Sequence, residues 1–242
     1  MKKLFRVLAA LIILALLYIV AIQWFTDPDI ALVVDRNRLP IDSLRFGKDF
    51  LWGASTSAYQ VGGNCTNCNW SQFETTLDPQ GHPRIVRGQR CGIASDHWNR
   101  YKEDIQLLKE LHLNAFRFSV EWSKVEPEEG VFVDSVLDHY ERVVDELRAN
   151  GIEPFITLHH FTNPLWFERK GRFERDDSPE ILARFAAQVA MRLGPKVQFW
   201  STINEPNIYA VEGYFRATFP PAIHDPAKDG RSIRGGCTGR ST

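Results

Sequence analysis

Short apolar runs of strand length alternate with helical patterns along the middle of this chain, and this alternation restricts the fold more than any other feature. The runs that we predict to be strands cover residues 50–54, 114–120, 153–160 and 197–204. Between them, apolar residues recur at helical spacing around residues 96–111, 137–147 and 182–189. A strict alternation of strand and helix requires a parallel sheet with right-handed crossovers. The sequence therefore predicts an α/β fold.

Polar side chains stand at or near the C-terminal end of every predicted strand. These side chains are Gln60, Arg117, Glu121, His159, His160, Asn204 and Glu205. In a (β/α) barrel the βα loops gather at that end, and binding and catalytic groups collect there. Neither Gly-x-Gly-x-x-Gly nor Gly-x-x-x-x-Gly-Lys follows a predicted strand, so a nucleotide-binding sheet loses its main support. We therefore expect a functional site along the carboxyl edge of the sheet.

Four longer segments carry a resemblance to a known family. They are FLWGASTSAYQ, SDHWNRYKEDIQLLKELHLNAFRFSVEWSKVEPEEGVF, GIEPFITLHHFTNPLWF and WSTINEPN. In order and spacing they resemble glycoside hydrolase family 1, the retaining β-glycosidases, over about residues 47–225. The resemblance implies a TIM (β/α)8 barrel, of which this chain holds about the first four βα units. It also implies β-glucosidase-like hydrolysis of a β-glycoside or oligosaccharide, without a cofactor or a metal.

The same resemblance implies a role for each matching side chain. Glu205 matches the general acid/base, and Asn204 matches the neighbour that hydrogen-bonds the sugar 2-hydroxyl. Gln60 and His160 match groups that hold hydroxyls of the sugar being cleaved. Arg117 matches the arginine that lies beneath the catalytic nucleophile.

Two local features bear on the chemistry of this expected site. A carboxylic acid that protonates a glycosidic oxygen must stay partly protonated near neutral pH, and an apolar surrounding favours that state. Pro206 biases the preceding Glu205 toward extended backbone geometry. We therefore expect Glu205 at an extended strand end within apolar surroundings. Phe161 stands where many family members have tryptophan, which keeps an apolar wall and bears on sugar preference.

Other polar and aromatic residues near these segments have simpler interpretations. Glu121 shares strand parity with Arg117, so we expect the two to form an ion pair. His159 has the opposite parity to His160 and is expected to pack or hydrogen-bond in the interior. The acidic residues within 126–129 indicate a solvated loop. Trp98 is expected to face the core from its helix, not to bind sugar.

One half of the expected chemistry has no counterpart in the sequence. A retaining glycosidase needs a second carboxylate about 5–5.5 Å from the acid/base. In the family this nucleophile lies in a Thr-Glu-Asn-Gly-like motif on strand seven, and no Glu-Asn-Gly occurs here. Residues 229–242 contain glycine and arginine without apolar periodicity, and we interpret them as an aberrant or disordered tail. We therefore expect an inactive fragment from a frameshift, assembly artefact or truncated gene; the alternative is a natural short paralogue that binds glycans at the membrane without catalysis.

The N-terminus has the pattern of a separate module. Lys2, Lys3 and Arg6 precede an apolar run that, with its flanks, is long enough to cross a bilayer. We expect residues 4–25 to contact the membrane as part of a signal anchor at 1–25, followed by a linker at 26–46 and the partial barrel at 47–228. The positive flank predicts a cytoplasmic N-terminus and a C-terminal region outside the cytoplasm. The alternative is a cleaved signal peptide and a secreted protein.

Charge and cysteine content restrict the partners further. The formal net charge of −1 gives no reason to expect nucleic acid. Two of Cys65, Cys68 and Cys91 are expected to form a disulfide outside the cytoplasm, without an indication of which two. A zinc site lacks an obvious fourth ligand. A redox-active Cys-x-x-Cys normally stands at a helix start, and Cys65–Cys68 lies between glycines and asparagines.

Overall fold

The computed structural model describes residues 11–20 and 45–224, and the chain divides into two compact units, Met1–Phe50 and Leu51–Thr242. In the first unit, residues 11–20 are helical with exposed side chains. Within the described residues, no helix is both long enough and apolar enough to cross a bilayer. The structure therefore does not support the predicted anchor. Residues 1–10 and 21–25 of that anchor, the linker up to residue 44 and the tail at 229–242 lie outside the described residues.

The second unit contains a parallel sheet with its four strands in chain order. The strands are β1 (Gly53–Ser55), β2 (Ala115–Ser119), β3 (Glu153–His159) and β4 (Phe199–Ile203). The register places Ser55 beside Arg117, Arg117 beside Phe155, and Phe155 beside Phe199. This parallel order confirms the βα alternation predicted from the sequence.

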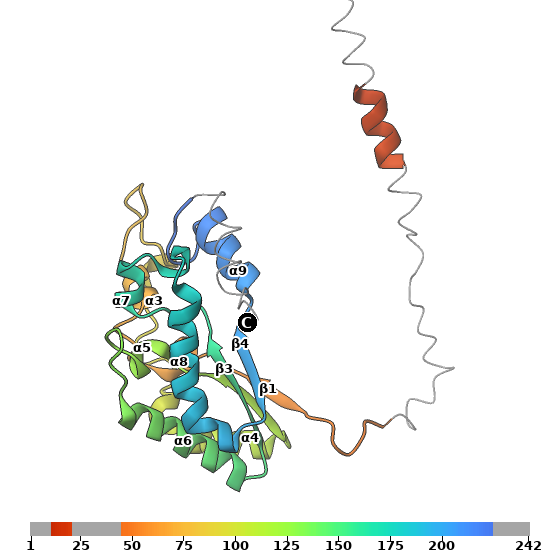
Figure 1. Ribbon diagram of the computed structural model, residues 1–242. Helices are drawn as coiled ribbons and strands as arrows, with labels where there is room; N and C mark the ends of the chain where they lie inside the picture. The colour runs from red at the N-terminus through yellow and green to blue at the C-terminus, as the bar shows by residue number, and fades with distance from the viewer. Residues whose placement is uncertain (1–10, 21–44, 225–242) are drawn as a thin grey trace, which may run out of the picture. The chain divides into compact units, whose positions relative to one another are not determined.

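Three long helices cross between the strands: α4 (His97–Glu110), α6 (Asp134–Ala149) and α8 (Ser178–Leu193). Figure 1 shows α6 and α8 side by side against the sheet. The shorter elements are α2 (Ala58–Gly62), α3 (Asn69–Phe73), η2 (Val86–Gly88), α5 (Trp122–Val125), α7 (Leu165–Arg169), η3 (Arg172–Glu174), η4 (Gly194–Lys196), α9 (Pro206–Ala210) and the π-helix η5 (Val211–Phe215). Most of them lie in the loops that follow the carboxyl ends of the strands.

The core lies between the sheet and the long helices because side chains alternate across a strand. Phe116, Phe118, Ile156 and Leu158 are buried and belong to one apolar cluster with the inner faces of α4, α6 and α8. Trp98 packs against this cluster, as predicted. The residues of opposite parity, such as those in the row from Arg117 to Phe199, form the other face of the sheet.

The two outer strands are less buried than the sequence predicts. The run at 50–54 was expected to be a buried strand, yet β1 begins only at Gly53, and Trp52 is 49% exposed. On β4, Phe199 is 40% exposed. Both strands stand at the ends of the sheet order and pair on one side only. An apolar sequence alone does not bury a strand that has no neighbour on its second side.

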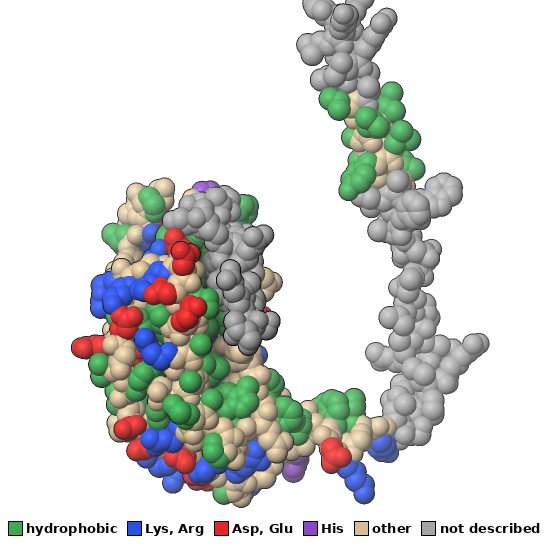
Figure 2. All heavy atoms as spheres, in the orientation of Figure 1, with side chains coloured by type: hydrophobic (Ala, Val, Ile, Leu, Met, Phe, Trp, Pro, Cys, Tyr) green, Lys and Arg blue, Asp and Glu red, His purple; other side chains and the backbone are tan. Residues whose placement is uncertain are grey.

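Charged side chains of both signs are intermixed on the face drawn in Figure 2. Part of this pattern links α6 with the C-terminal end of α8. Lys196 Nζ donates to Glu141 at 2.8 Å and to Asp145 at 2.7 Å, and Arg192 pairs with Asp138. Such exposed pairs contribute little individually to the free energy of unfolding, and they keep the helix surface compatible with water.

Glu126 contradicts the prediction of a solvated acidic loop. Its side chain is fully buried, whereas Glu128 two residues later is exposed. Trp122 Nε1 donates to Glu126 Oε2 at 2.8 Å, and the Gly130 backbone N–H donates to Oε1 at 2.7 Å. The Arg184 guanidinium on α8 also reaches Oε1, at 2.5 Å. These hydrogen bonds replace those that the carboxylate would make to water, so its burial leaves no uncompensated charge.

Candidate active site

A chain of hydrogen bonds joins three of the predicted site residues at the carboxyl edge of the sheet. Arg117 on β2 donates through Nη2 to Asn204 Oδ1 at 2.7 Å and through Nε to Thr157 Oγ1 at 2.8 Å. Asn204 directs its amide nitrogen toward Glu205 Oε2, at 3.4 Å. Its backbone N–H donates to the carbonyl of His159 at 2.9 Å. Because Arg117 takes the amide oxygen, the Asn204 NH2 group remains directed toward Glu205.

The backbone of Glu205 differs from the extended geometry that the sequence predicts. Glu205 has φ 43° and ψ 60°, in the left-handed region, and is the N-cap of α9. Pro206 is the first helical residue, so Glu205 must turn the chain from β4 into α9 at once. A non-glycine residue in this region is strained, and such residues are frequent at functional sites. The strain indicates that the position of this carboxylate is specified by the fold.

The surroundings of Glu205 also differ from the prediction. Its side chain is exposed, although an apolar enclosure was expected. The reason is its place after β4, which is the last strand of the described sheet and has no neighbour on its outer side. Asn204, immediately before it, is buried. The hydrogen-bonding neighbour of the acid is therefore already enclosed, while the acid itself is not.

A separate pocket of about 360 Å³ collects the other predicted binding residues. Gln60, His160 and Phe161 line it together with Trp70 and Phe219, and Asn204 and Glu205 are not part of its lining. The rings of Trp70 and Phe219 lie 4.9 Å apart, and those of Phe161 and Phe219 lie 5.8 Å apart. Such aromatic walls suit the apolar faces of a sugar ring, while the amide and imidazole offer hydrogen bonds.

The two histidines at the end of β3 have different environments. His159 is 1% exposed, and its Nε2 lies 2.8 Å from Asn163 Oδ1, which confirms its predicted interior role. His160 faces the pocket, and its buried Nδ1 has no hydrogen-bond partner among the described residues. Burial, and then the nearby charge of Arg117, lower the pKa of His160 to about 4. Burial also lowers the pKa of His159 to about 4. Both rings are therefore neutral near pH 7.

We expect an NMR titration of the folded chain to show both histidines neutral down to about pH 5. Since the unfolded pKa is about 6.5, the unfolded state binds these protons more readily than the folded state. Stability is therefore fully present above pH 6.5 and is lost as the pH falls toward 4, by about 3 kcal/mol for the buried His159. Arg117→Gln should raise the pKa of His160 because it removes a neighbouring positive charge. Midpoints near 6.5 in the folded chain would contradict this assignment.

Glu121 does not pair with Arg117, contrary to the prediction. Its carboxylate is 2% exposed and accepts hydrogen bonds from Ser123 Oγ at 2.7 Å and Thr162 Oγ1 at 3.0 Å. Burial raises its pKa, and these hydrogen bonds oppose that rise. β2 ends at Ser119, and Glu121 already caps α5, so strand parity no longer determines its direction.

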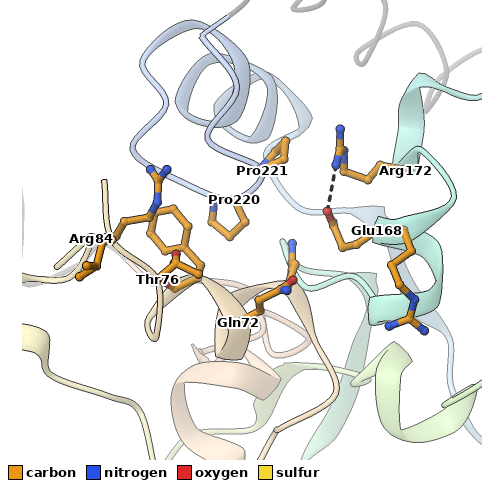
Figure 3. Close-up of a pocket in the computed structure, with 11 residues that line it drawn as sticks. Gln72, Thr76, Arg84, Glu168, Arg172, Pro220 and Pro221 are labelled. Atoms are coloured by element: carbon orange, nitrogen blue, oxygen red, sulfur yellow. Dashed lines mark hydrogen bonds and ion pairs between the residues drawn. The ribbon is translucent and has the colours of Figure 1, made fainter. Parts of the chain in front are cut away.

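A second pocket, of about 450 Å³, contains none of the predicted residues. Figure 3 shows Glu168 and Arg172 paired on one side of it, with Arg84 on the other side. The guanidinium of Arg84 lies over the ring of Phe73, 5.3 Å from its centre. Arg84, Glu168 and Arg172 thus each contact another side chain of the protein.

Sequence reasoning missed three residues of the candidate site. Thr157 accepts a hydrogen bond from Arg117. The β2–β3 register could have predicted this contact, because both residues lie on the same face of adjacent strands. Trp70 and Phe219 line the sugar-sized pocket from segments far apart in the sequence. The only sequence signal for them is the aromatic content of the chain, 12%, which does not specify positions.

Comparisons with known proteins identify a family. The profile of Glycosyl hydrolase family 1 matches residues 42–233. Beta-glucosidase A of Acetivibrio thermocellus is 33% identical over 191 residues, covering 76% of this chain and 42% of its own length. Coniferin beta-glucosidase of Pinus contorta is 36% identical over 194 residues, covering 78% of this chain and 36% of its own.

Solved structures show the same likeness. A beta-glycosidase from Pyrococcus horikoshii superposes with a TM-score of 0.71 at 38% identity, covering 80% of this chain and 44% of its own. The Thermotoga maritima beta-glucosidase in complex with cyclophellitol superposes with a TM-score of 0.75 at 30% identity. This match covers 79% of this chain and 44% of the other. The chain thus spans less than half the length of these relatives.

The four-stranded parallel sheet superposes on part of the TIM barrels of solved beta-glycosidases, so the chain has the partial-barrel fold of that class. Within that class, the chain belongs to glycosyl hydrolase family 1.

Proposed function

We propose that this site is the acid/base half of a site for retaining hydrolysis of β-linked O-glycosides, with Glu205 in the position of the general acid/base. The observation that carries this proposal is the hydrogen-bonded chain from Arg117 through Asn204 to Glu205. In this proposal the Asn204 amide also donates to the sugar 2-hydroxyl, a contact that strengthens in an oxocarbenium-like transition state. Relatives named as beta-glucosidases support the substrate class.

The pocket supplies a binding role that fits this chemistry. His160 lines the pocket and offers its neutral imidazole to a sugar hydroxyl, and Gln60 offers an amide in the same lining. Phe161, Trp70 and Phe219 provide aromatic surfaces for the apolar faces of the ring. We propose that these residues bind the hydroxyls and the apolar faces of the sugar that is cleaved.

We propose further that these 242 residues bind such a glycoside without hydrolysing it. The sequence has no Glu-Asn-Gly motif to supply the nucleophile of the family. Glu205 is also exposed, so among the described residues it lacks the water-excluding enclosure of a closed active site. The second candidate function is glycan binding without catalysis. The exposure of Glu205 and the pocket lined by Trp70, Phe161 and Phe219 favour it.

The experiment is an assay of the whole chain with an activated aryl β-glucoside, alongside the Glu205→Gln variant. We expect no turnover above the uncatalysed rate in either protein. Quenching of Trp70 fluorescence by the glucoside should report binding, and His160→Ala should weaken it. Turnover that disappears in Glu205→Gln would contradict the proposed inactivity and would mean that another carboxylate acts as nucleophile, with Glu121 the first to test.

A further inference from the structure

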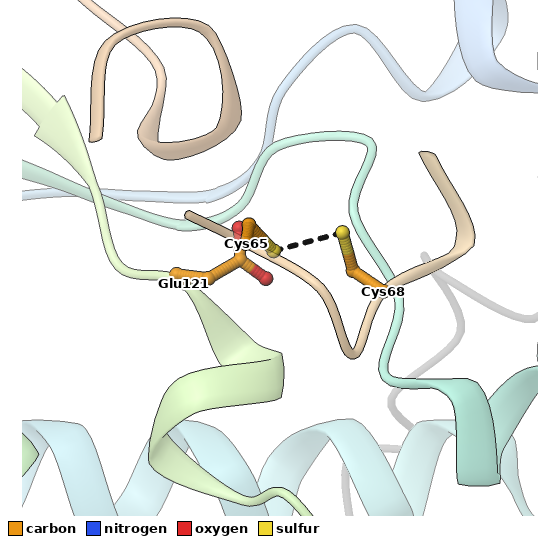
Figure 4. A group of neighbouring side chains, drawn as sticks. All are labelled: Cys65, Cys68 and Glu121. Carbon is orange, nitrogen blue, oxygen red and sulfur yellow. Dashed lines mark hydrogen bonds between the residues drawn. The ribbon is translucent and has the colours of Figure 1, made fainter. Parts of the chain in front are cut away.

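Cys65 and Cys68 form a close pair of thiols outside the candidate sugar pocket. Their sulfur atoms are 2.8 Å apart, and both cysteines are free. Cys68 is the N-cap of α3, so the pair stands at a helix start, where the sequence did not suggest one. Figure 4 shows the two sulfurs facing each other, with the carboxylate of Glu121 beside Cys65. The sulfur atoms of Cys65 and Cys68 and a carboxylate oxygen of Glu121 all lie within 4.8 Å of one another.

The loop that carries the two cysteines is held on both sides. Gly63 has φ +80°, and a Cβ there would lie 2.4 Å from the carbonyl oxygen of Ile93, so only glycine fits this turn. Asn67, between the cysteines, donates from Nδ2 to the carbonyl of Pro127 at 2.9 Å. Its own carbonyl accepts from the N–H of Leu165 at 3.2 Å. The thiols therefore face each other because the backbone is fixed.

The two thiols differ in access. Cys68 is fully buried, whereas Cys65 is half-buried and lines an open cavity of about 420 Å³. Asn64, Thr66 and Arg90 line the same cavity, which gives it polar walls. Because only Cys65 of the two borders this cavity, we place the first attack at Cys65 and the second at Cys68. Thiol–disulfide exchange requires this division between an attacking and a resolving thiol.

The surroundings disfavour a charged thiolate at Cys65 and a metal at the cluster, so the first attack is expected to be slow near neutral pH. The hydrogen bond with Cys68, burial and the nearby Glu121 charge all raise the pKa of the Cys65 thiol. A zinc site would need both thiolates beside a buried carboxylate that already accepts bonds from Ser123 and Thr162. A disulfide is neutral and adds no charge to this interior.

We propose that Cys65 and Cys68 form a dithiol site that small organic disulfides of the glutathione type oxidise to an intramolecular disulfide. The Cys65 sulfur loses its proton and attacks one sulfur of the reagent. The S–S bond of the reagent breaks, a mixed disulfide forms on Cys65, and the other half of the reagent leaves as a thiol. Cys68 then attacks the sulfur of Cys65, and its proton leaves with the second thiol. Two electrons and two protons pass from the protein to the reagent.

The site has a structural link to the candidate pocket. α3, which begins directly after Cys68, carries Trp70 into the pocket lining. Asn69 on the same helix donates to the carbonyl of Phe161 at 3.2 Å. A bond between the two sulfurs would thus fix the start of the helix that holds one aromatic wall.

The test equilibrates the reduced whole chain in buffers of oxidised and reduced glutathione, traps the thiols by alkylation and maps them by mass spectrometry. We expect a Cys65–Cys68 bond, with Cys91 alkylated and with Cys91→Ser behaving as the wild type. Cys68→Ser should accumulate glutathione on Cys65, whereas Cys65→Ser should not accumulate it on Cys68. The equilibrium constant for the bond should be at least about tenfold greater in the native chain than in concentrated guanidinium, because only the fold holds the sulfurs together.

Three results would overturn the proposal. One is an equal equilibrium constant in native and denatured chains, which would leave the fold without a role. Another is pairing of Cys65 or Cys68 with Cys91 or with Cys237. The third is a purified chain that retains stoichiometric zinc and whose thiols resist oxidation until a chelator is added, which would assign the cluster to a metal.

Discussion

Replacing Glu205 by glutamine is expected to lower kcat by a factor of about 10² to 10⁴ once the missing carboxylate is supplied. The protein to use is a chimera in which the C-terminal segment of the Thermotoga maritima beta-glucosidase follows residue 224 of this chain. Glutamine keeps the shape of the side chain and removes its proton. The loss should therefore lie in kcat, with little change in the binding of the glycoside.

The control for this experiment is Glu103→Gln. Glu103 is an exposed carboxylate on α4 that pairs with Arg100, away from the carboxyl edge of the sheet. We expect its kcat to match that of the unaltered chimera. Equal kcat values for the Glu205 and Glu103 variants would show that Glu205 takes no part in proton transfer.

Glu126→Ala is expected to lower the free energy of unfolding by about 3 kcal/mol. The substitution leaves the buried Nε1 of Trp122 and the backbone N–H of Gly130 without their acceptor. It also removes the partner of Arg184, which ties α8 to the segment after α5. Urea unfolding of the chain, followed by circular dichroism, measures this change.

Glu128→Ala provides the matched comparison, because it removes an acidic side chain from the same loop at an exposed position. We expect a change within about 0.5 kcal/mol. A similar loss for both variants would mean that the loop, not the buried carboxylate, determines the effect.

The contrast between Glu126 and Glu128 shows where sequence reasoning reaches its limit. The alternation of apolar runs predicted the four parallel strands, because periodicity records which face of an element meets the core. It could not predict the burial of Glu126, since one of its donors, Arg184, comes from a helix far along the chain. Whether a carboxylate is solvated depends on such distant partners.

The candidate site was likewise predicted from the sequence only in part. The motifs place Arg117, Asn204 and Glu205 at the carboxyl edge of the sheet, and the structure connects them by hydrogen bonds. Glu121 was assigned to Arg117 by strand parity, which fails once the chain has turned into α5. The left-handed backbone of Glu205 opposes the usual effect of a following proline, because the start of α9 fixes the turn.

The most direct test of the acid/base assignment is the dependence of kcat/KM, which reports the glycosylation step, on the leaving group in the chimera. A phenol of low pKa departs without protonation, whereas a phenol of high pKa or an alcohol needs a proton from the acid. If Glu205 is the acid, Glu205→Gln should lose little rate for glycosylation with a dinitrophenyl glucoside and much more with a methylphenyl glucoside. An equal loss of rate for both substrates would contradict the assignment.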